Sequence, residues 1–150
     1  MNAEKFATLF RPAERNLPAM LDAQAARYGD KPLVTASGTT LSFREARELA
    51  AGFGGTLLRA GIRRGDRVAL ICGNSLDFVT IMLGTAWTGA VLVPINTGSR
   101  GPQLAHILRN CGARLLILEA EFLAALDHAE IGETALEALW LIGKIGRAHV

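Results

Sequence analysis

Three short, continuously apolar runs constrain the fold of this chain more than any other feature. They are Val68–Cys72, Val91–Pro94 and Leu115–Leu118, and segments of helical periodicity separate them. Strands that are apolar at every position are typical of parallel sheets, because helices cover both faces of such sheets. The block Gly65–Ile117 therefore predicts strand, helix, strand, helix and strand, which is an α/β fold with a largely parallel sheet.

The remaining elements follow from apolar periodicity and from start and stop residues. The capping-box pattern Ser42–Glu45 opens one helix, and Ser37-Gly38 favours a hairpin of two short strands before it. The predicted elements are helices over 17–28, 43–57, 76–88, 101–111 and 121–129, hairpin strands over 33–36 and up to Leu41, and a last strand over 138–142.

For two of these helices, the residue pattern predicts how they pack. Gly52, Gly54 and Gly55 weaken the helix that contains them, so we expect close packing against a neighbour to compensate. The helix over 76–88 is apolar nearly all round, and we expect it to be covered on both sides.

Composition bounds the class of protein. A length of 150 residues, half of them apolar, suits one domain or a piece of a larger one. The net charge of +2 comes from scattered residues, which argues against nucleic acid as a partner. Cys72 and Cys111 lack metal-site spacing, and we expect buried thiols in a reducing cytoplasm.

One uncharged segment has to be weighed against a membrane-spanning interpretation. Residues 78–95 form an uncharged run of 18, the lower limit for a transmembrane helix. Gly84 and Gly89 interrupt it and Pro94 ends it, so we expect a buried helix followed by a buried strand. The charged N-terminus is not a secretory signal, and we expect a cytoplasmic location.

The two ends of the chain differ from the middle. Residues 1–16 are a lead-in, and 17–143 form the predicted domain. Residues 144–150 read KIGRAHV, which is the translation of a common sequencing adapter, so we interpret this tail as an artefact and the domain as truncated. Without Lys144 and Arg147 the basic and acidic residues are equal, at 14 each.

Motifs that carry chemistry do not emerge from the residues alone. The chain has no phosphate-binding G-x-x-x-x-G-K-[ST], no G-x-G-x-x-G after a strand and no G-x-S-x-G. His106, His128 and His149 lie too far apart in sequence to predict a metal site. Glu119 and Glu121 follow a strand, where α/β proteins bind ligands, but a solvated loop that opens the next helix is the preferred interpretation.

Short motifs spread over most of the chain resemble one enzyme family. In order they are Leu41–Glu45, Gly61-Ile62, Gly65–Ala69, Asn74-Ser75 with Phe78, Gly89-Ala90, Val93–Asn96, Arg100-Gly101, Leu104, Ile107-Leu108 and Ala113–Ile117. From Leu17 to Gly143 the chain is similar to the N-terminal part of the AMP-binding, adenylate-forming superfamily. The segments VPINT and RGPQLAHIL look most like acyl-CoA synthetases of the crotonobetaine/carnitine-CoA ligase type.

The resemblance implies the activity of a longer protein. Family members use ATP and Mg²⁺ to convert a small-molecule carboxylic acid into an acyl-adenylate, and the ligase branch transfers the acyl group to coenzyme A. The family's phosphate-binding loop, magnesium ligand, ribose-binding Asp and catalytic Lys all follow the position matched by Gly143. We therefore assign no catalytic, cofactor-binding or metal residue, and we expect residues 1–150 alone to bind no cofactor and to be inactive.

Two alternatives stay open. The chain could belong to an adenylation domain that loads a carrier protein instead of coenzyme A, or it could be a non-catalytic α/β scaffold or interaction module. The sequence downstream of Gly143 would separate them. The acyl substrate and the oligomeric state are not encoded in any feature that we recognise.

Overall fold

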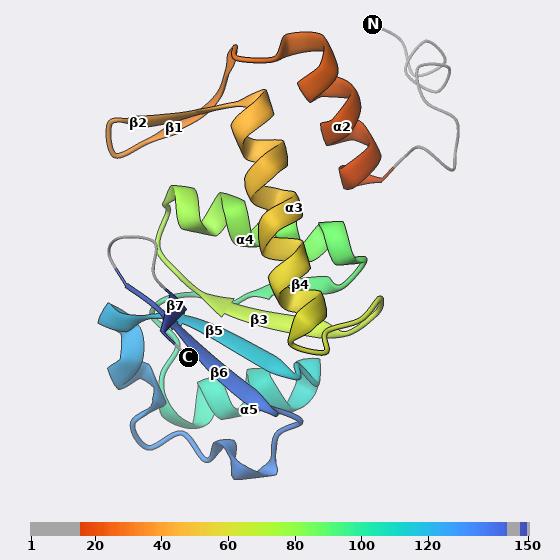
Figure 1. The fold of residues 1–150 in the computed structure, drawn as a ribbon. Coiled ribbons are helices and arrows are strands. Elements are labelled where there is room, and N and C mark those ends of the chain that lie inside the picture. The colour runs from red at the N-terminus through yellow and green to blue at the C-terminus, as the bar shows by residue number, and fades with distance from the viewer. Residues whose placement is uncertain (1–15, 144–147, 150) are drawn as a thin grey trace, which may run out of the picture.

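The computed structural model describes residues 16–143 and 148–149, and its elements form layers around one sheet (Figure 1). The sheet's strands are β3 (Arg67–Ile71), β4 (Val91–Pro94), β5 (Leu115–Glu119), β6 (Ala138–Ile142) and β7 (Ala148–His149). Their spatial order is β4-β3-β5-β6-β7. The first four run parallel, whereas β7 pairs with β6 in the antiparallel direction. The predicted α/β fold with a largely parallel sheet is confirmed.

The helices and the hairpin lie close to their predicted positions. They are α2 (Leu17–Tyr28), β1 (Pro32–Ala36), β2 (Thr39–Ser42), α3 (Phe43–Arg59), α4 (Leu76–Thr88) and α5 (Gly101–Cys111). The predicted capping box is present: Ser42 Oγ accepts from Glu45 N at 3.2 Å, and Glu45 Oε2 accepts from Ser42 N at 2.8 Å. The two hairpin strands pair antiparallel, as expected.

The winding of the chain changes side at β3. From β3 the chain passes through α4 to β4, and from there through α5 to β5, which lies on the other side of β3. The helices α3 and α4 cover one face of the sheet and α5 covers the opposite face (Figure 1). The carboxyl ends of β3 and β5 therefore meet at a topological switch point, where open α/β sheets commonly bind ligands.

Strand β3 shows why the apolar runs are continuous. Val68 and Leu70 join the core on the side of α3 and α4, whereas Ala69 and Ile71 join the core on the side of α5. All four side chains are 0–1% exposed. A fully buried Val, Leu or Ile stabilises a fold by about 1.5–3 kcal/mol relative to an exposed one, so both faces of the strand contribute.

The crossing of α3 and α4 explains only some of the glycines. A Cβ on Gly84 would lie 2.7 Å from Phe53 Cδ1, and one on Gly54 would lie 3.0 Å from Trp87 Cβ. The expectation of close packing is thus confirmed at Gly54. It is wrong at Gly52, where an added Cβ would meet nothing within 4 Å.

The segment predicted as a helix over 121–129 differs in the structure. It forms the 3-10 helix η2 (Ala120–Leu126), and a second one, η3 (Ile131–Glu133), follows. No side chain caps the start of η2, and its end has an extended Asp127 and a left-handed His128 with φ 60°. An α-helix cannot continue through those two conformations.

Helix α4 is less covered than we expected. Its buried residues are Ile81, Leu83, Gly84 and Thr85, and the others are half-buried. The membrane-like run 78–95 is divided between α4 and β4, with a left-handed Gly89 (φ 75°) between them. Within residues 16–143 and 148–149, no helix is long and apolar enough to cross a membrane.

Candidate functional site

The carboxyl ends of β3 and β5 bring together a half-buried carboxylate, a buried thiol and the hydroxyl that caps α4. Glu119, the last residue of β5, accepts a hydrogen bond from Gly73 N with its Oε2 at 2.9 Å. Cys72 Sγ lies 3.5 Å from Ser75 Oγ, which in turn accepts from Phe78 N at 3.2 Å and caps α4. The loop between β3 and α4 is therefore held by one carboxylate and one hydroxyl.

Burial and negative charge alter the acid–base properties of this edge. Burial is the main cause that raises the pKa of the Cys72 thiol to about 11, and the Glu119 carboxylate adds to the rise. Burial likewise raises the pKa of Asp77, with a further contribution from Glu119. Because thiolates rather than thiols are nucleophilic, Cys72 is unsuited to attack an electrophile near neutral pH.

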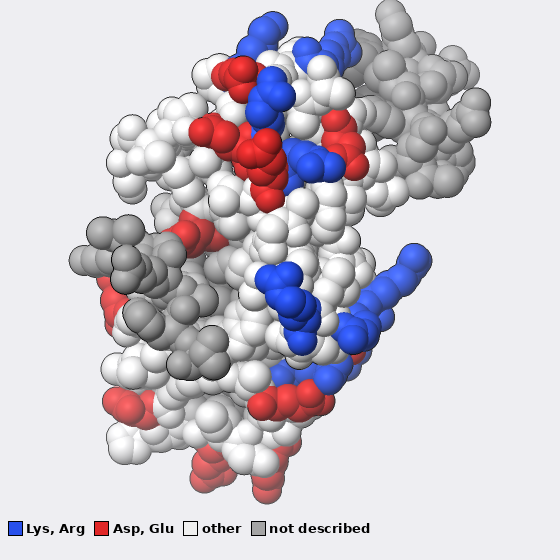
Figure 2. Space-filling view, viewed as in Figure 1, with Lys and Arg blue, Asp and Glu red and all other residues white. Residues whose placement is uncertain are grey.

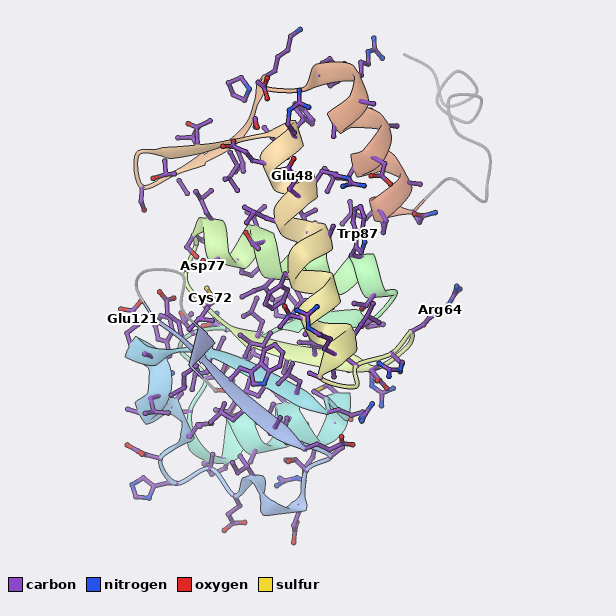
Figure 3. The ribbon with its side chains drawn as sticks, in the orientation of Figure 1. Glu48, Arg64, Cys72, Asp77, Trp87 and Glu121 are labelled. Carbon is purple, nitrogen blue, oxygen red and sulfur yellow. The ribbon has the colours of Figure 1, made fainter. Side chains whose placement is uncertain are left out.

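The two glutamates that follow β5 have different surroundings. Glu119 is half-buried and bound to the Gly73 amide, whereas Glu121 is exposed in the first turn of η2. Figure 3 shows Glu121 at the same edge of the sheet as Cys72 and Asp77. The Gly73 amide thus gives Glu119 a structural contact that Glu121 does not share. The preferred interpretation, a solvated loop that opens the next helix, describes Glu121 but not Glu119.

The histidines and cysteines do not form a metal centre in the described part of the chain. His106 is exposed on α5, and His128 is exposed beside a cavity of about 110 Å³ that Arg109 and Glu130 also line. No group of three or more His, Cys, Asp or Glu side chains among the described residues could hold a metal ion. Cys72 is buried as expected, but Cys111 is only half-buried, and both are free thiols.

The opposite end of the strands carries a charge network that we did not predict. Arg114 pairs with Glu137 (Nη2 to Oε2, 2.7 Å) and also with Asp66. Arg67 donates to the carbonyl oxygen of Cys111 at 3.0 Å and so caps the end of α5. The sequence did contain one signal for this network, because Asp66, Arg67 and Arg114 are among the residues that carry the family resemblance.

In this network each charged side chain favours the charged form of its partners. A hydrogen bond from Arg63 N and the Arg114 guanidinium lower the pKa of Asp66. Arg114 also lowers the pKa of Glu137, while Glu137 and Asp66 together raise the pKa of Arg114. On the face of the molecule in Figure 2, basic and acidic side chains lie interspersed over α2 and α3. Two exposed ion pairs there are Asp30–Arg44 and Asp22–Arg47.

Comparisons with known proteins place this arrangement in a family. The profile described as AMP-binding enzyme matches residues 21–141. The fatty acid–[acyl-carrier-protein] ligase ScoC of Streptomyces coeruleorubidus is 34% identical over 114 residues, which cover 76% of this chain and 22% of that protein. The crotonobetaine/carnitine–CoA ligase of Salmonella paratyphi A is 34% identical over 143 residues, which cover 87% of this chain and 26% of that protein.

Solved structures show the same likeness. The crystal structure of the anthranilate CoA ligase AuaEII in complex with anthranoyl-AMP has a TM-score of 0.81 and 29% identity, and the match covers 95% of this chain and 27% of that one. The chain thus spans about a quarter of the length of these relatives. Since the family profile matches most of its residues, the chain belongs to the AMP-binding enzyme family, as its resemblance to adenylate-forming enzymes indicated.

Proposed function

We propose that this chain is the N-terminal part of an ATP-dependent acyl-CoA ligase. Such an enzyme activates a small-molecule carboxylic acid as acyl-AMP and transfers the acyl group to coenzyme A. A carboxylate is a poor electrophile, and its mixed anhydride with AMP supplies the leaving group that the thiol displaces. The observation that carries the proposal is the family match over residues 21–141, together with relatives that are named CoA ligases.

We propose further that residues 17–143 contribute scaffold and no catalytic group. The polar groups at the carboxyl edge are occupied, Glu119 by the Gly73 amide and Ser75 by the start of α4. The acidic side chains there would repel a triphosphate rather than bind it. The carboxyl edge therefore offers no group suited to a triphosphate, which supports the proposal that the full-length enzyme binds ATP, Mg²⁺ and coenzyme A through other parts of its chain.

A chimeric enzyme tests the scaffold proposal. Residues 21–141 would replace the matching segment of the Salmonella crotonobetaine/carnitine–CoA ligase, and acyl-CoA formation would be measured with the host's acids. We expect the chimera to form acyl-CoA with the host's order of substrate preference. A folded chimera with an altered substrate preference would contradict the proposal, since the graft would then contribute to the site. Pyrophosphate exchange into ATP by residues 1–150 alone would contradict it as well.

A carrier-protein ligase is the second candidate function. The specific observation in its favour is the 34% identity to ScoC, whose name gives an acyl-carrier protein as acceptor. The full-length enzyme would be incubated with ATP, an acid and either coenzyme A or a phosphopantetheinylated carrier protein. The mass of each product identifies the acceptor. Acylation of the carrier protein alone would favour this second candidate.

The cellular compartment that we propose is the cytoplasm. Both cysteines of the described chain are free thiols, which suits a reducing compartment. Fractionation of the source cells with an antibody against the chain tests this.

A further inference from the structure

Two of the glycines inside α3 have no packing reason to be glycine. A Cβ on Gly52 would meet nothing within 4 Å, and one on Gly55 would meet only the tip of the Arg59 side chain, at 3.4 Å. Gly54 lies between them and is pressed against α4. Glycine weakens the interior of a helix because its backbone loses more conformational freedom there. The weakest turn of α3 therefore surrounds the point at which α4 fixes it.

The two halves of α3 belong to different hydrophobic clusters. Before Gly52, Ala46 and Ala50 pack with Leu21 of α2 and Leu83 of α4, and these four are the buried members of that cluster. After it, Leu57 packs in the larger cluster on the face of the sheet. Val79, Met82 and Trp87 of α4 are only partly buried against this cluster, which has four buried members where the cluster on the sheet has eight, and local opening is easiest where fewer residues are buried.

The N-terminal half of α3 is tied to the elements that precede it. The rings of Tyr28 and Phe43 lie 5.0 Å apart, and Arg44 pairs with Asp30. In Figure 1, α2 and the β1–β2 hairpin lie with this half of α3 at the end of the molecule remote from β6. Because these contacts join the N-terminal half of α3 to the residues before it, we treat α2, the hairpin and this half of α3 as one packed unit.

We propose that α3 is a pivot. Residues 17–51, which comprise α2, the hairpin and the first half of α3, open from α4 as one unit. The opening bends α3 at Gly52, while Gly54 stays against Trp87 and α4 stays on the sheet.

Arg47 stabilises the closed state. Its guanidinium lies 5.3 Å from the centre of the Trp87 ring on α4, and its Nε donates to Asp22 of α2 at 2.8 Å. One side chain thus joins the moving unit to the fixed helix. Figure 3 shows Trp87 beside α3, on the side of α2.

Hydrogen exchange of the full 150-residue chain, followed by mass spectrometry, tests the pivot. We expect amides in α2, the hairpin and the first half of α3 to exchange together and faster than those in β3 and β5. Gly52→Ala should slow exchange in 17–51 about 5-fold and leave β3 and β5 unchanged, because alanine resists bending of the helix. Gly132→Ala is the matched control, since its Cβ would also meet nothing within 4 Å but it lies outside α3. It should change neither region.

Arg47→Ala provides the opposite perturbation. We expect it to speed exchange in 17–51 several-fold, with β3 and β5 unchanged. The pivot is overturned if Gly52→Ala slows β3 and β5 as much as it slows 17–51. It is also overturned if exchange slows within α3 but not in α2 and the hairpin, because Gly52 would then only lower the helix propensity of α3.

Discussion

The two ends of the parallel strands are built differently. At the amino ends, Asp66, Arg114 and Glu137 each precede a strand by one residue, and they form one connected charge network. At the carboxyl ends, the loop after β3 is held by the neutral amide of Gly73 on the Glu119 carboxylate, beside a buried thiol. Charge pairing thus aligns the starts of β3, β5 and β6, whereas the Glu119 carboxylate and the Ser75 hydroxyl hold the loop at the opposite edge.

This difference indicates which end of the sheet contributes more to the stability of the fold. The amino-end network joins residues 23 and 48 positions apart, so it can form only when all three strands have their native register. The carboxyl edge has fewer constraints, and that edge is the one at which α/β folds place ligands. We infer that this chain fixes its sheet at one end and leaves the loops at the other end less restrained.

Removal of Arg114 should have the largest effect. Arg114→Ala leaves Asp66 and Glu137 without their cation and deletes contacts that join three strands. We expect the melting temperature to fall by roughly 5–10 °C, measured by circular dichroism. Arg44→Ala is the control, because it breaks the exposed pair with Asp30 and should change the melting temperature by less than about 2 °C. Equal losses in both variants would contradict a special contribution of the amino-end network.

Acid should weaken the same network. The pKa values of Asp66 and Glu137 are lowered in the folded chain, so their contribution is complete above their unfolded pKa values of about 4 and is lost as pH falls through the lower folded values. Melting temperatures of the wild type and of Arg114→Ala would be compared from pH 7 to pH 3. We expect the gap between them to narrow below about pH 4. A gap that does not depend on pH would show that the arginine acts through packing alone.

Most of the fold could be predicted because each element carries its own boundary signals. The bounds of α4 follow from Ser75, which caps it, and from Gly89, which takes the left-handed conformation at its end. Strand β6 was likewise predicted over its observed residues from apolar runs alone. The exception was 121–129, where helical composition was overruled by the backbone conformations of Asp127 and His128. Local composition does not encode those conformations.

The candidate site was less predictable because its contacts are long-range. The position of Glu119 at a strand end followed from the sequence, but its hydrogen bond to Gly73 depends on β3 and β5 being neighbours. The ion pairs of Arg114 with Asp66 and Glu137 likewise depend on β3, β5 and β6 being neighbours. A single sequence gives the strands but not their order, so the sharing of a carboxylate between two strand ends could not be derived.

Loss of Glu119 should have a smaller effect than loss of Arg114. Glu119→Ala leaves the half-buried Gly73 amide without its acceptor, and we expect it to cost about 1 kcal/mol in the free energy of unfolding, measured by urea denaturation. Glu121→Ala, on the exposed neighbouring carboxylate, is the control and should stay within about 0.5 kcal/mol of the wild type. If both variants lose the same amount, the hydrogen bond to Gly73 does not hold the loop, and the carboxyl edge has no dedicated constraint.

Alkaline pH should reveal the buried thiol at the carboxyl edge. The pKa of Cys72 is about 11 in the folded chain, above the unfolded value of about 8.5. Its contribution to stability is therefore complete below about pH 8.5 and declines as pH rises toward 11. We expect the urea midpoint to fall between pH 8 and pH 10 in the wild type. The fall should be shallower in Cys72→Ala, which has no thiol to ionise at this position. The control is Cys111→Ala, which removes a half-buried thiol and should retain the fall of the wild type. A slope that persists unchanged in Cys72→Ala would mean that the thiol is free to ionise in the folded chain, and the carboxyl edge would then be more open to water than its burial indicates.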